Sequence, residues 1–244
     1  MRLMVSVVSA GEARRALAGG AEILDVKNPG EGSLGAQTPS VIRAIRKIGP
    51  GKTDVSVAIG DMPNLPGTAA LAALGAAACG ADYIKVGVYG PRTEPEAKAL
   101  LHAVRQSVRG YPVSVIAAGY ADFRRAGTLD PACLPRIAAA AGIQGCLLDT
   151  AIKDGKTLFD FIGPQRLRAL ARRSHELGLL FGLAGALAAG DLDTAQDLGA
   201  DVVGLRTAVC RNGQRSGPLE TRRVRSLLEH LNRARRRAGA GGVT

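Results

Sequence analysis

Eight short runs of apolar or β-branched residues alternate with longer amphipathic stretches, rich in alanine and arginine, along the whole chain. This rhythm is typical of parallel strands joined by crossover helices. It predicts an α/β protein with a (β/α)8 barrel fold. A doubly wound open sheet is the alternative, but the Gly-x-Gly-x-x-Gly sequence expected after its first strand is missing. The expected strands span residues 3–8, 23–27, 54–58, 83–86, 113–118, 145–149, 179–183 and 202–205.

A Gly-Ala pair followed by an acidic residue recurs at 20–22, 80–82 and 199–201, each time between an expected helix and an expected strand. Such recurrence predicts a repeated turn from helix to strand. The chain also lacks a Pro-, Ser- or Gly-rich linker that would divide it. We therefore expect a single barrel domain over residues 1–237 and a flexible C-terminal tail over residues 238–244.

Composition and charge exclude several classes of protein. No stretch approaches the roughly 20 apolar residues of a membrane span, and the start of the chain lacks a signal-peptide pattern, so we expect a cytoplasmic protein. The net charge of +11 favours phosphorylated substrates or nucleic acid, but much of it lies within the arginine-rich segment 222–237. RNA binding is the minority alternative because aromatic residues, which stack on bases, make up 3% of the chain. The cysteines and histidines show no ligand spacing, so neither a metal nor another cofactor is expected.

Charged residues lie near the ends of three alternate strands of the expected barrel. Asp25 and Lys27 end the second strand, Lys85 lies in the fourth, and Asp149 ends the sixth. Strand alternation places Asp25 and Lys27 on the same side of their strand. Side chains from alternate strands share a layer inside a barrel, and the active site lies at the carboxyl ends of the strands. We therefore expect these four side chains to meet at the mouth of the barrel.

Two lysines in one desolvated pocket can supply a reactive amine. Each ammonium group disfavours the charge of the other, and burial acts in the same direction. At least one of Lys27 and Lys85 should then have a lowered pKa and be available as a free amine that adds to a carbonyl as an imine. The other lysine or a carboxylate would move protons. The alternative interpretation is a set of buried salt bridges that only hold the barrel together.

A phosphate site is expected after the seventh and eighth strands, where barrels of this kind often have one. Gly185 and Ala186 follow the seventh strand, and their small side chains allow backbone N–H groups to close on a phosphate. Gly204 and Arg206 belong to the eighth strand and its end, and Arg206 is expected to add a charged fork.

Two further loops are candidates for a second anion site. Ser33 lies in a glycine-rich loop directly after Lys27, where backbone N–H groups could cradle an anion. Lys153 follows Asp149 and is a candidate cationic contact for a second phosphate, whereas Lys156 is expected to belong to a plain turn.

Motifs distributed from the second to the eighth strand, with flanking sequence that matches from the first, resemble the (5-formylfuran-3-yl)methyl phosphate synthase family. These are the 4-hydroxymethyl-2-furancarboxaldehyde-phosphate synthases of methanofuran biosynthesis. Composition rich in alanine and arginine suits a high-GC bacterium, in which the related cofactor methylofuran serves one-carbon oxidation. The motifs are DVKNP at 25–29, EGSLGA at 31–36, YIKVG at 83–87, LLDTAIKDGKTLFD at 147–160, GLAGAL at 182–187 and VVGLRTAVC at 202–210.

The resemblance implies a carbon–oxygen lyase that condenses two molecules of glyceraldehyde 3-phosphate into a phosphorylated furfural, with loss of one phosphate and two waters. It implies that Lys27 is the Schiff-base lysine and Lys85 the proton acceptor, supported by Asp25, Asp149 and Lys153. The partner would be a small phosphorylated aldehyde, and a homo-oligomer is compatible with these features. From the residues alone, a class I aldolase or a triose-phosphate-type isomerase is the alternative enzyme.

Overall fold

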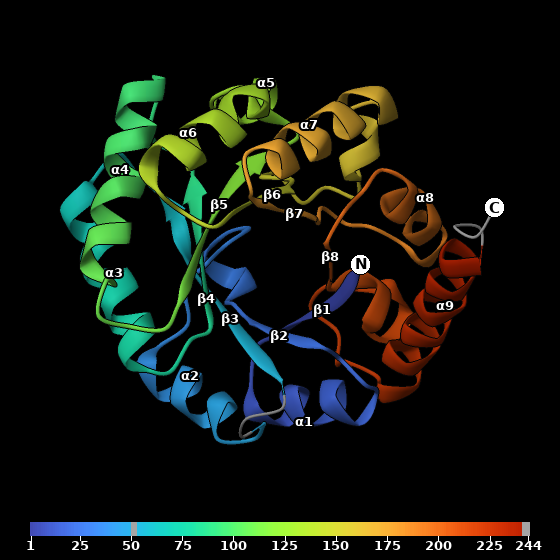
Figure 1. The fold of residues 1–244 in the computed structure, drawn as a ribbon. Coiled ribbons are helices and arrows are strands. Elements are labelled where there is room, and N and C mark those ends of the chain that lie inside the picture. The colour runs from blue at the N-terminus through green and yellow to red at the C-terminus, as the bar shows by residue number, and fades with distance from the viewer. Residues whose placement is uncertain (50–52, 241–244) are drawn as a thin grey trace.

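Eight parallel strands form a closed barrel in the computed structural model, which describes residues 1–49 and 53–240 (Figure 1). Each strand pairs with the next one in the sequence, and β8 pairs with β1 to close the ring. The predicted (β/α)8 barrel is therefore confirmed, and the open sheet is excluded. The strands are β1 (Arg2–Val7), β2 (Ile23–Val26), β3 (Asp54–Met62), β4 (Tyr83–Val88), β5 (Ser114–Tyr120), β6 (Gly145–Asp149), β7 (Leu180–Leu183) and β8 (Val202–Leu205).

Helices surround the barrel and cover the outward face of its strands (Figure 1). The α-helices are α1 (Ala10–Ala18), α2 (Pro39–Arg46), α3 (Pro66–Ala78), α4 (Glu94–Ser107), α5 (Phe123–Ala126), α6 (Leu134–Ala141), α7 (Pro164–Glu176), α8 (Leu192–Asp197) and α9 (Thr221–Ala240). Short 3-10 helices are η1 (Pro29–Glu31), η2 (Pro131–Cys133), η3 (Leu158–Asp160), η4 (Ala189–Asp191), η5 (Thr207–Val209) and η6 (Arg211–Gly213).

The predicted recurrent turn is confirmed at all three Gly-Ala pairs. Gly20, Gly80 and Gly199 have φ angles of 92°, 89° and 87°, in the region that favours glycine because a side chain would be strained there. In each turn the glycine N–H donates to the carbonyl of the residue three positions earlier, at 2.9 Å. Each helix ends two residues before its glycine, and the chain turns there into the next strand.

Two apolar cores lie on opposite sides of the strands. The larger core fills the space between the barrel and its helices and includes side chains from every strand. The smaller core lies inside the barrel around Met4, Ile116 and Leu147, and Tyr120 lies within it. Hydrophobic burial on the helix side stabilises the ring. The carboxyl end of the barrel interior can therefore hold polar residues.

Three strands end later than the sequence predicts: β3, β5 and also β4, which continues by two residues to Val88. Strand β3 continues past Ala58 to Met62 through an irregularity in its pairing with β4, and Gly60 within it has a φ of 127°. The Gly-Asp sequence at 60–61 is typical of a turn, but the strand continues through it. Strand β5 continues to Tyr120. The extensions of β3 and β5 carry the polar side chains of Asp61 and Tyr120 toward the mouth of the barrel.

Helix α9 completes the outer ring between α8 and α1 (Figure 1). Two of its arginines contact α1 and the turn that follows it: Arg225 donates to the carbonyl of Ala18 at 3.3 Å, and Arg235 pairs with Glu22 at 2.7 Å. The helix extends to Ala240, so part of the predicted tail over 238–244 continues it, and residues 241–244 lie outside the described residues. Within the described chain, helices both long and apolar enough to cross a membrane are absent.

Candidate active site

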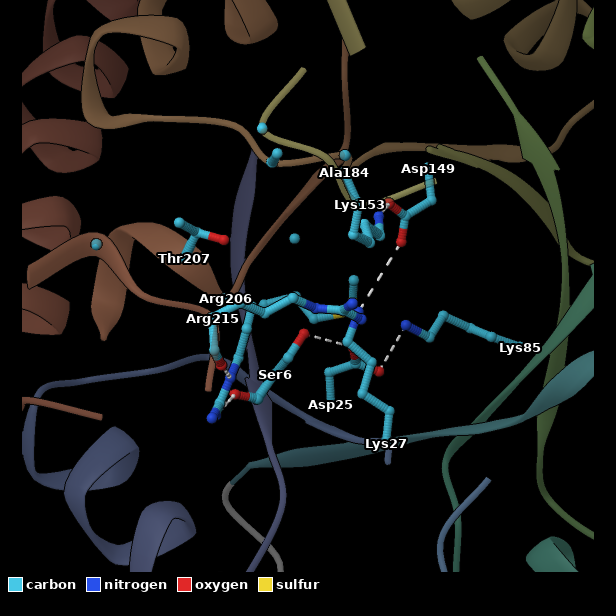
Figure 2. A pocket seen from close by; sticks show the side chains of 16 residues that line it. Ser6, Asp25, Lys27, Lys85, Asp149, Lys153, Ala184, Arg206, Thr207 and Arg215 are labelled. Carbon is cyan, nitrogen blue, oxygen red and sulfur yellow. Dashed lines mark hydrogen bonds and ion pairs between the residues drawn. The ribbon is translucent and has the colours of Figure 1, made fainter. Parts of the chain in front are cut away.

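The four predicted charged side chains meet in one pocket at the carboxyl end of the strands (Figure 2). The Lys85 Nζ lies 2.6 Å from Asp25 Oδ1, and Ser6 Oγ donates to Asp25 Oδ2 at 2.9 Å. The Lys27 Nζ lies 3.9 Å from Asp149 Oδ2. Each lysine therefore faces its own carboxylate, and the pocket they line has a volume of about 270 Å³.

Burial of these groups follows from their places on the strands. Asp25 and Lys85 lie within β2 and β4, and Asp149 is the last residue of β6. Lys27 comes directly after β2, and its backbone N–H donates to the Val7 carbonyl at 3.2 Å, which prolongs the strand pairing. All four residues are at most 5% exposed. At such burial an unpaired charge would be costly, so the pairing offsets part of the cost of burying these groups.

Lys27 is the lysine with the altered titration. Burial lowers its pKa from 10.5 to about 8, and the neighbouring Lys85 and Lys153 act in the same direction. Asp149 and Asp25 oppose this shift by stabilising the ammonium form. With a pKa near 8, about one molecule in ten carries the neutral amine at pH 7. The site can therefore present a nucleophilic amine near neutral pH.

Asp149 lies between two lysines and stays ionised. Burial would raise its pKa, but Lys153 and Lys27 outweigh burial and hold the pKa well below its usual range. Lys153 Nζ contacts Asp149 Oδ1 and donates to Thr150 Oγ1 at 2.9 Å, and the Thr150 N–H donates to Asp149 at 2.8 Å. The Lys153 side chain is 17% exposed, so its ammonium remains within reach of a ligand in the pocket.

The glycine and alanine residues predicted to bind phosphate line the same pocket. Gly185 and Ala186 form a tight turn after β7, with φ angles of 101° and 55°. The left-handed conformation of Ala186 is strained for a residue with a side chain, and such strain is often found at functional sites. Gly204 lines the pocket from β8, where a Cβ would lie 2.8 Å from Met4 Cε.

Ser33 lies behind Lys27 and is committed to the protein. Its hydroxyl donates to the Thr150 carbonyl at 2.8 Å, and its own carbonyl accepts from Lys27 Nζ at 3.4 Å. The backbone N–H groups of Ser33 and Leu34 donate to Asp61 Oδ2 at 2.8 and 3.3 Å. These two N–H groups are therefore already used, and the observed contacts make Ser33 a support for the amine of Lys27.

Arg206 also lines the pocket, but its guanidinium points away into the protein (Figure 2). It pairs with the buried carboxylate of Glu12 and donates to the carbonyls of Ser6, Arg215 and Gly217. These contacts use all five of its N–H groups. A direct contact between Arg206 and phosphate, as the sequence suggests, would require some of these bonds to break.

Sequence reasoning missed several residues that line the pocket or support it from behind. Ser6 could have been noticed as a polar residue in an otherwise apolar strand. Asp61 accepts from the Tyr120 hydroxyl and supports the loop behind Lys27, but both residues lie on the unpredicted extensions of β3 and β5. Thr207 lies in the VVGLRTAVC motif but received no role, and Arg215 comes from the long loop after β8, where no sequence pattern marked it.

Fold and pocket together define a (β/α)8-barrel protein whose catalytic end carries a buried cluster of lysines and carboxylates. The chain matches the 4-HFC-P synthase family model over residues 3–228. It is 49% identical to (5-formylfuran-3-yl)methyl phosphate synthase from Methanopyrus kandleri over 233 residues, covering 94% of this chain and 98% of that protein. It is 46% identical to the synthase of the same name from Methanocaldococcus jannaschii over 232 residues, covering 94% and 99%. The chain therefore belongs to the 4-HFC-P synthase family and is an enzyme of the furan-forming synthase type.

Solved structures with the same architecture are more distant in sequence. A 3-hexulose-6-phosphate synthase superposes with a TM-score of 0.65 at 19% identity, covering 93% of this chain and 99% of that one. Phosphoribosyl anthranilate isomerase from Thermus thermophilus superposes with a TM-score of 0.61 at 20% identity, covering 96% and 99%. At these identities the likeness shows the fold alone.

Proposed function

We propose that this enzyme condenses two molecules of glyceraldehyde 3-phosphate into 4-(hydroxymethyl)-2-furancarboxaldehyde phosphate through a Schiff base on Lys27. The observation that carries the proposal is the buried Lys27 amine, with a pKa of about 8, at the mouth of the barrel. The relatives from Methanopyrus kandleri and Methanocaldococcus jannaschii are (5-formylfuran-3-yl)methyl phosphate synthases, which supports the product. The reaction would be that of a carbon–oxygen lyase acting on phosphates, within methanofuran or methylofuran biosynthesis.

The chemistry balances with this stoichiometry. Addition of the Lys27 amine to a triose carbonyl releases one water, and hydrolysis of the imine later consumes one, so the two steps cancel. An imine withdraws electrons from its neighbouring carbon, so that carbon loses a proton and attacks the aldehyde of the second triose. One carbon–oxygen bond then breaks to release phosphate, and closure of the furan ring releases two waters. Two three-carbon units thus give a six-carbon product that retains one phosphate.

Lys85 and Asp25 are suited to move protons in this sequence. Their 2.6 Å contact lets the pair share a proton, and Ser6 holds the second oxygen of Asp25 in place. Asp149, which stays ionised, faces the Lys27 amine and would stabilise the positive charge of the protonated imine.

Two phosphorylated substrates need two anion sites. The turn at Gly185 and Ala186 after β7, beside Gly204, supports one of them. Lys153, which belongs to the loop after β6 and remains partly exposed, supports the other. The substrate class we propose is therefore a small phosphorylated aldehyde.

Two measurements on the same protein test this function. Incubation with glyceraldehyde 3-phosphate should produce the strong ultraviolet absorbance of a conjugated furan aldehyde, which an aldolase or isomerase would not produce. Borohydride reduction during turnover should then leave a three-carbon adduct on the peptide that contains Lys27. Lys156→Ala is the control variant: this lysine is exposed and lies over the Phe161 ring, so the variant should keep both the furan absorbance and the Lys27 adduct. An adduct confined to another lysine, or substrate turnover without furan absorbance, would contradict the proposal.

A further inference from the structure

The loop after β8 brings an arginine to the mouth of the pocket. This loop contains η5 and η6 and is held closed by pairing between Cys210 and Leu219 just before α9. Arg215 lies on it, half-buried, and lines the pocket. Its side chain extends into the pocket (Figure 2). It also donates to the Gly32 carbonyl, in the loop after β2, at 3.3 Å.

The charge of Arg215 is poorly compensated. Within residues 1–49 and 53–240 its guanidinium makes no ion pair, and the Gly32 carbonyl is the one acceptor it contacts. Burial lowers its pKa, Arg206 acts in the same direction, and Asp149 and Asp61 only partly offset these effects. A partly desolvated guanidinium with unused N–H groups is suited to bind an anion with two hydrogen bonds.

Arg206 positions this second arginine. Its Nε donates to the Arg215 carbonyl at 2.9 Å, and its Nη2 donates to the Gly217 carbonyl two residues further along. Glu12 neutralises the charge of Arg206 and fixes its orientation. The two arginines therefore have different roles: Arg206 anchors the loop after β8, and Arg215 presents its unused N–H donors to the pocket.

Thr207 adds a neutral donor on the same side. It is half-buried and lines the pocket, and its hydroxyl points toward the middle of the pocket (Figure 2). The turn at Gly185 and Ala186 lines the pocket as well. An anion in this space would thus meet a guanidinium, a hydroxyl and a tight turn of small residues.

We propose that Arg215 and Thr207 bind the phosphate of one triose phosphate substrate opposite the turn at Gly185 and Ala186. The proposal rests on the proposed function for the identity of the substrate, but the anion site itself is testable without catalysis. It makes Arg215 the residue that separates phosphorylated aldehydes from those that lack a phosphate.

Titration calorimetry with inorganic phosphate tests the site directly. We expect Arg215→Met to weaken phosphate binding about tenfold or more, because a charge-assisted bidentate contact is lost. Arg215→Lys keeps the charge but not the paired N–H donors, so its phosphate affinity should fall between those of the unaltered enzyme and Arg215→Met. Thr207→Val should weaken phosphate binding about threefold to tenfold. Arg211→Met is the matched control: this arginine lies on the same loop, but its side chain is 61% exposed and pairs with Glu220. It should bind phosphate as the unaltered enzyme does.

Borohydride trapping at Lys27 separates phosphate recognition from a merely structural role. Arg215→Met should slow trapping of glyceraldehyde 3-phosphate and leave trapping of glyceraldehyde, which lacks the phosphate, unchanged. Equal slowing with both aldehydes, or phosphate affinity like that of the unaltered enzyme, would overturn the proposal. If the unaltered enzyme formed no Lys27 adduct at all, the proposed function would fail, while calorimetry would still decide the anion site. Should Arg215→Met fail to fold, Arg215→Lys and Thr207→Val carry the same test.

Discussion

Two sets of buried charges lie at the carboxyl end of the barrel, and they are built differently. In the first, Lys27 faces Asp149 across 3.9 Å, and its pKa falls to about 8. In the second, Arg206 and Glu12 are in close contact, and the guanidinium also donates to three backbone carbonyls. Lysine loses its proton readily when it is desolvated, whereas arginine keeps its charge. The loosely paired lysine is thus suited to react, and the fully bonded arginine is suited to hold the structure.

Loss of the Lys27 amine should have the largest effect. We expect Lys27→Ala to lower furan formation by about 10⁴-fold or more, the order found when a covalent nucleophile is removed from other enzymes. The free energy of unfolding should change far less than the activity, because the substitution removes a desolvated ammonium together with its contact to Asp149. Ultraviolet kinetics and urea denaturation measure the two quantities. A variant with most of its activity intact would remove Lys27 from the reactive set.

Replacement of Lys85 should separate proton transfer from imine formation. Lys85→Met is expected to lower turnover by about 10² to 10⁴-fold, the range for a general acid or base. Borohydride should still trap an adduct on Lys27, because the Lys27 amine is intact. Mass spectrometry of the trapped protein provides the check. If the adduct disappeared in this variant and lay on Lys85 in the unaltered enzyme, the two lysines would exchange roles.

Arg206→Met tests the structural member of the comparison. The carboxylate of Glu12, whose side chain is 6% exposed, would lose its partner inside the protein. We expect the free energy of unfolding to fall by about 3 to 5 kcal/mol, as for other broken buried ion pairs. Adding Glu12→Gln should restore part of this loss, since the unpaired charge is then gone. A decrease below about 1 kcal/mol by urea denaturation would show that the pair contributes little.

The smallest expected effect is a shift in pH dependence. Imine formation requires the neutral Lys27 amine, so the trapping rate should rise with pH and level off above a midpoint near 8. Asp149 raises the pKa of Lys27 by favouring its ammonium form. Asp149→Asn should therefore move this midpoint to lower pH. The rate of borohydride trapping at Lys27, measured across a pH series, provides the check. Movement to higher pH would mean that Asp149 does not act on Lys27 by its charge.

Much of the fold and the centre of the pocket could be predicted from the sequence because both depend on strand periodicity. Alternation along β2 placed Asp25 and Lys27 on one side, and the barrel brought Lys85 and Asp149 to them. Arg215 could not be predicted in this way: it contacts Gly32, 183 positions away, through a loop without periodicity. The orientation of Arg206 depended on Glu12 at the other end of the chain.

Closure of the ring between β1 and β8 has a consequence during synthesis of the protein. Ser6 on the first strand and the loop after the last strand belong to one pocket, so this pocket is incomplete until nearly the whole chain has left the ribosome. Until then Lys27 would be hydrated and protonated like any surface lysine, because its shift in pKa arises first from burial. The low pKa of Lys27 is therefore a property of the closed barrel and not of the short segment that carries the residue.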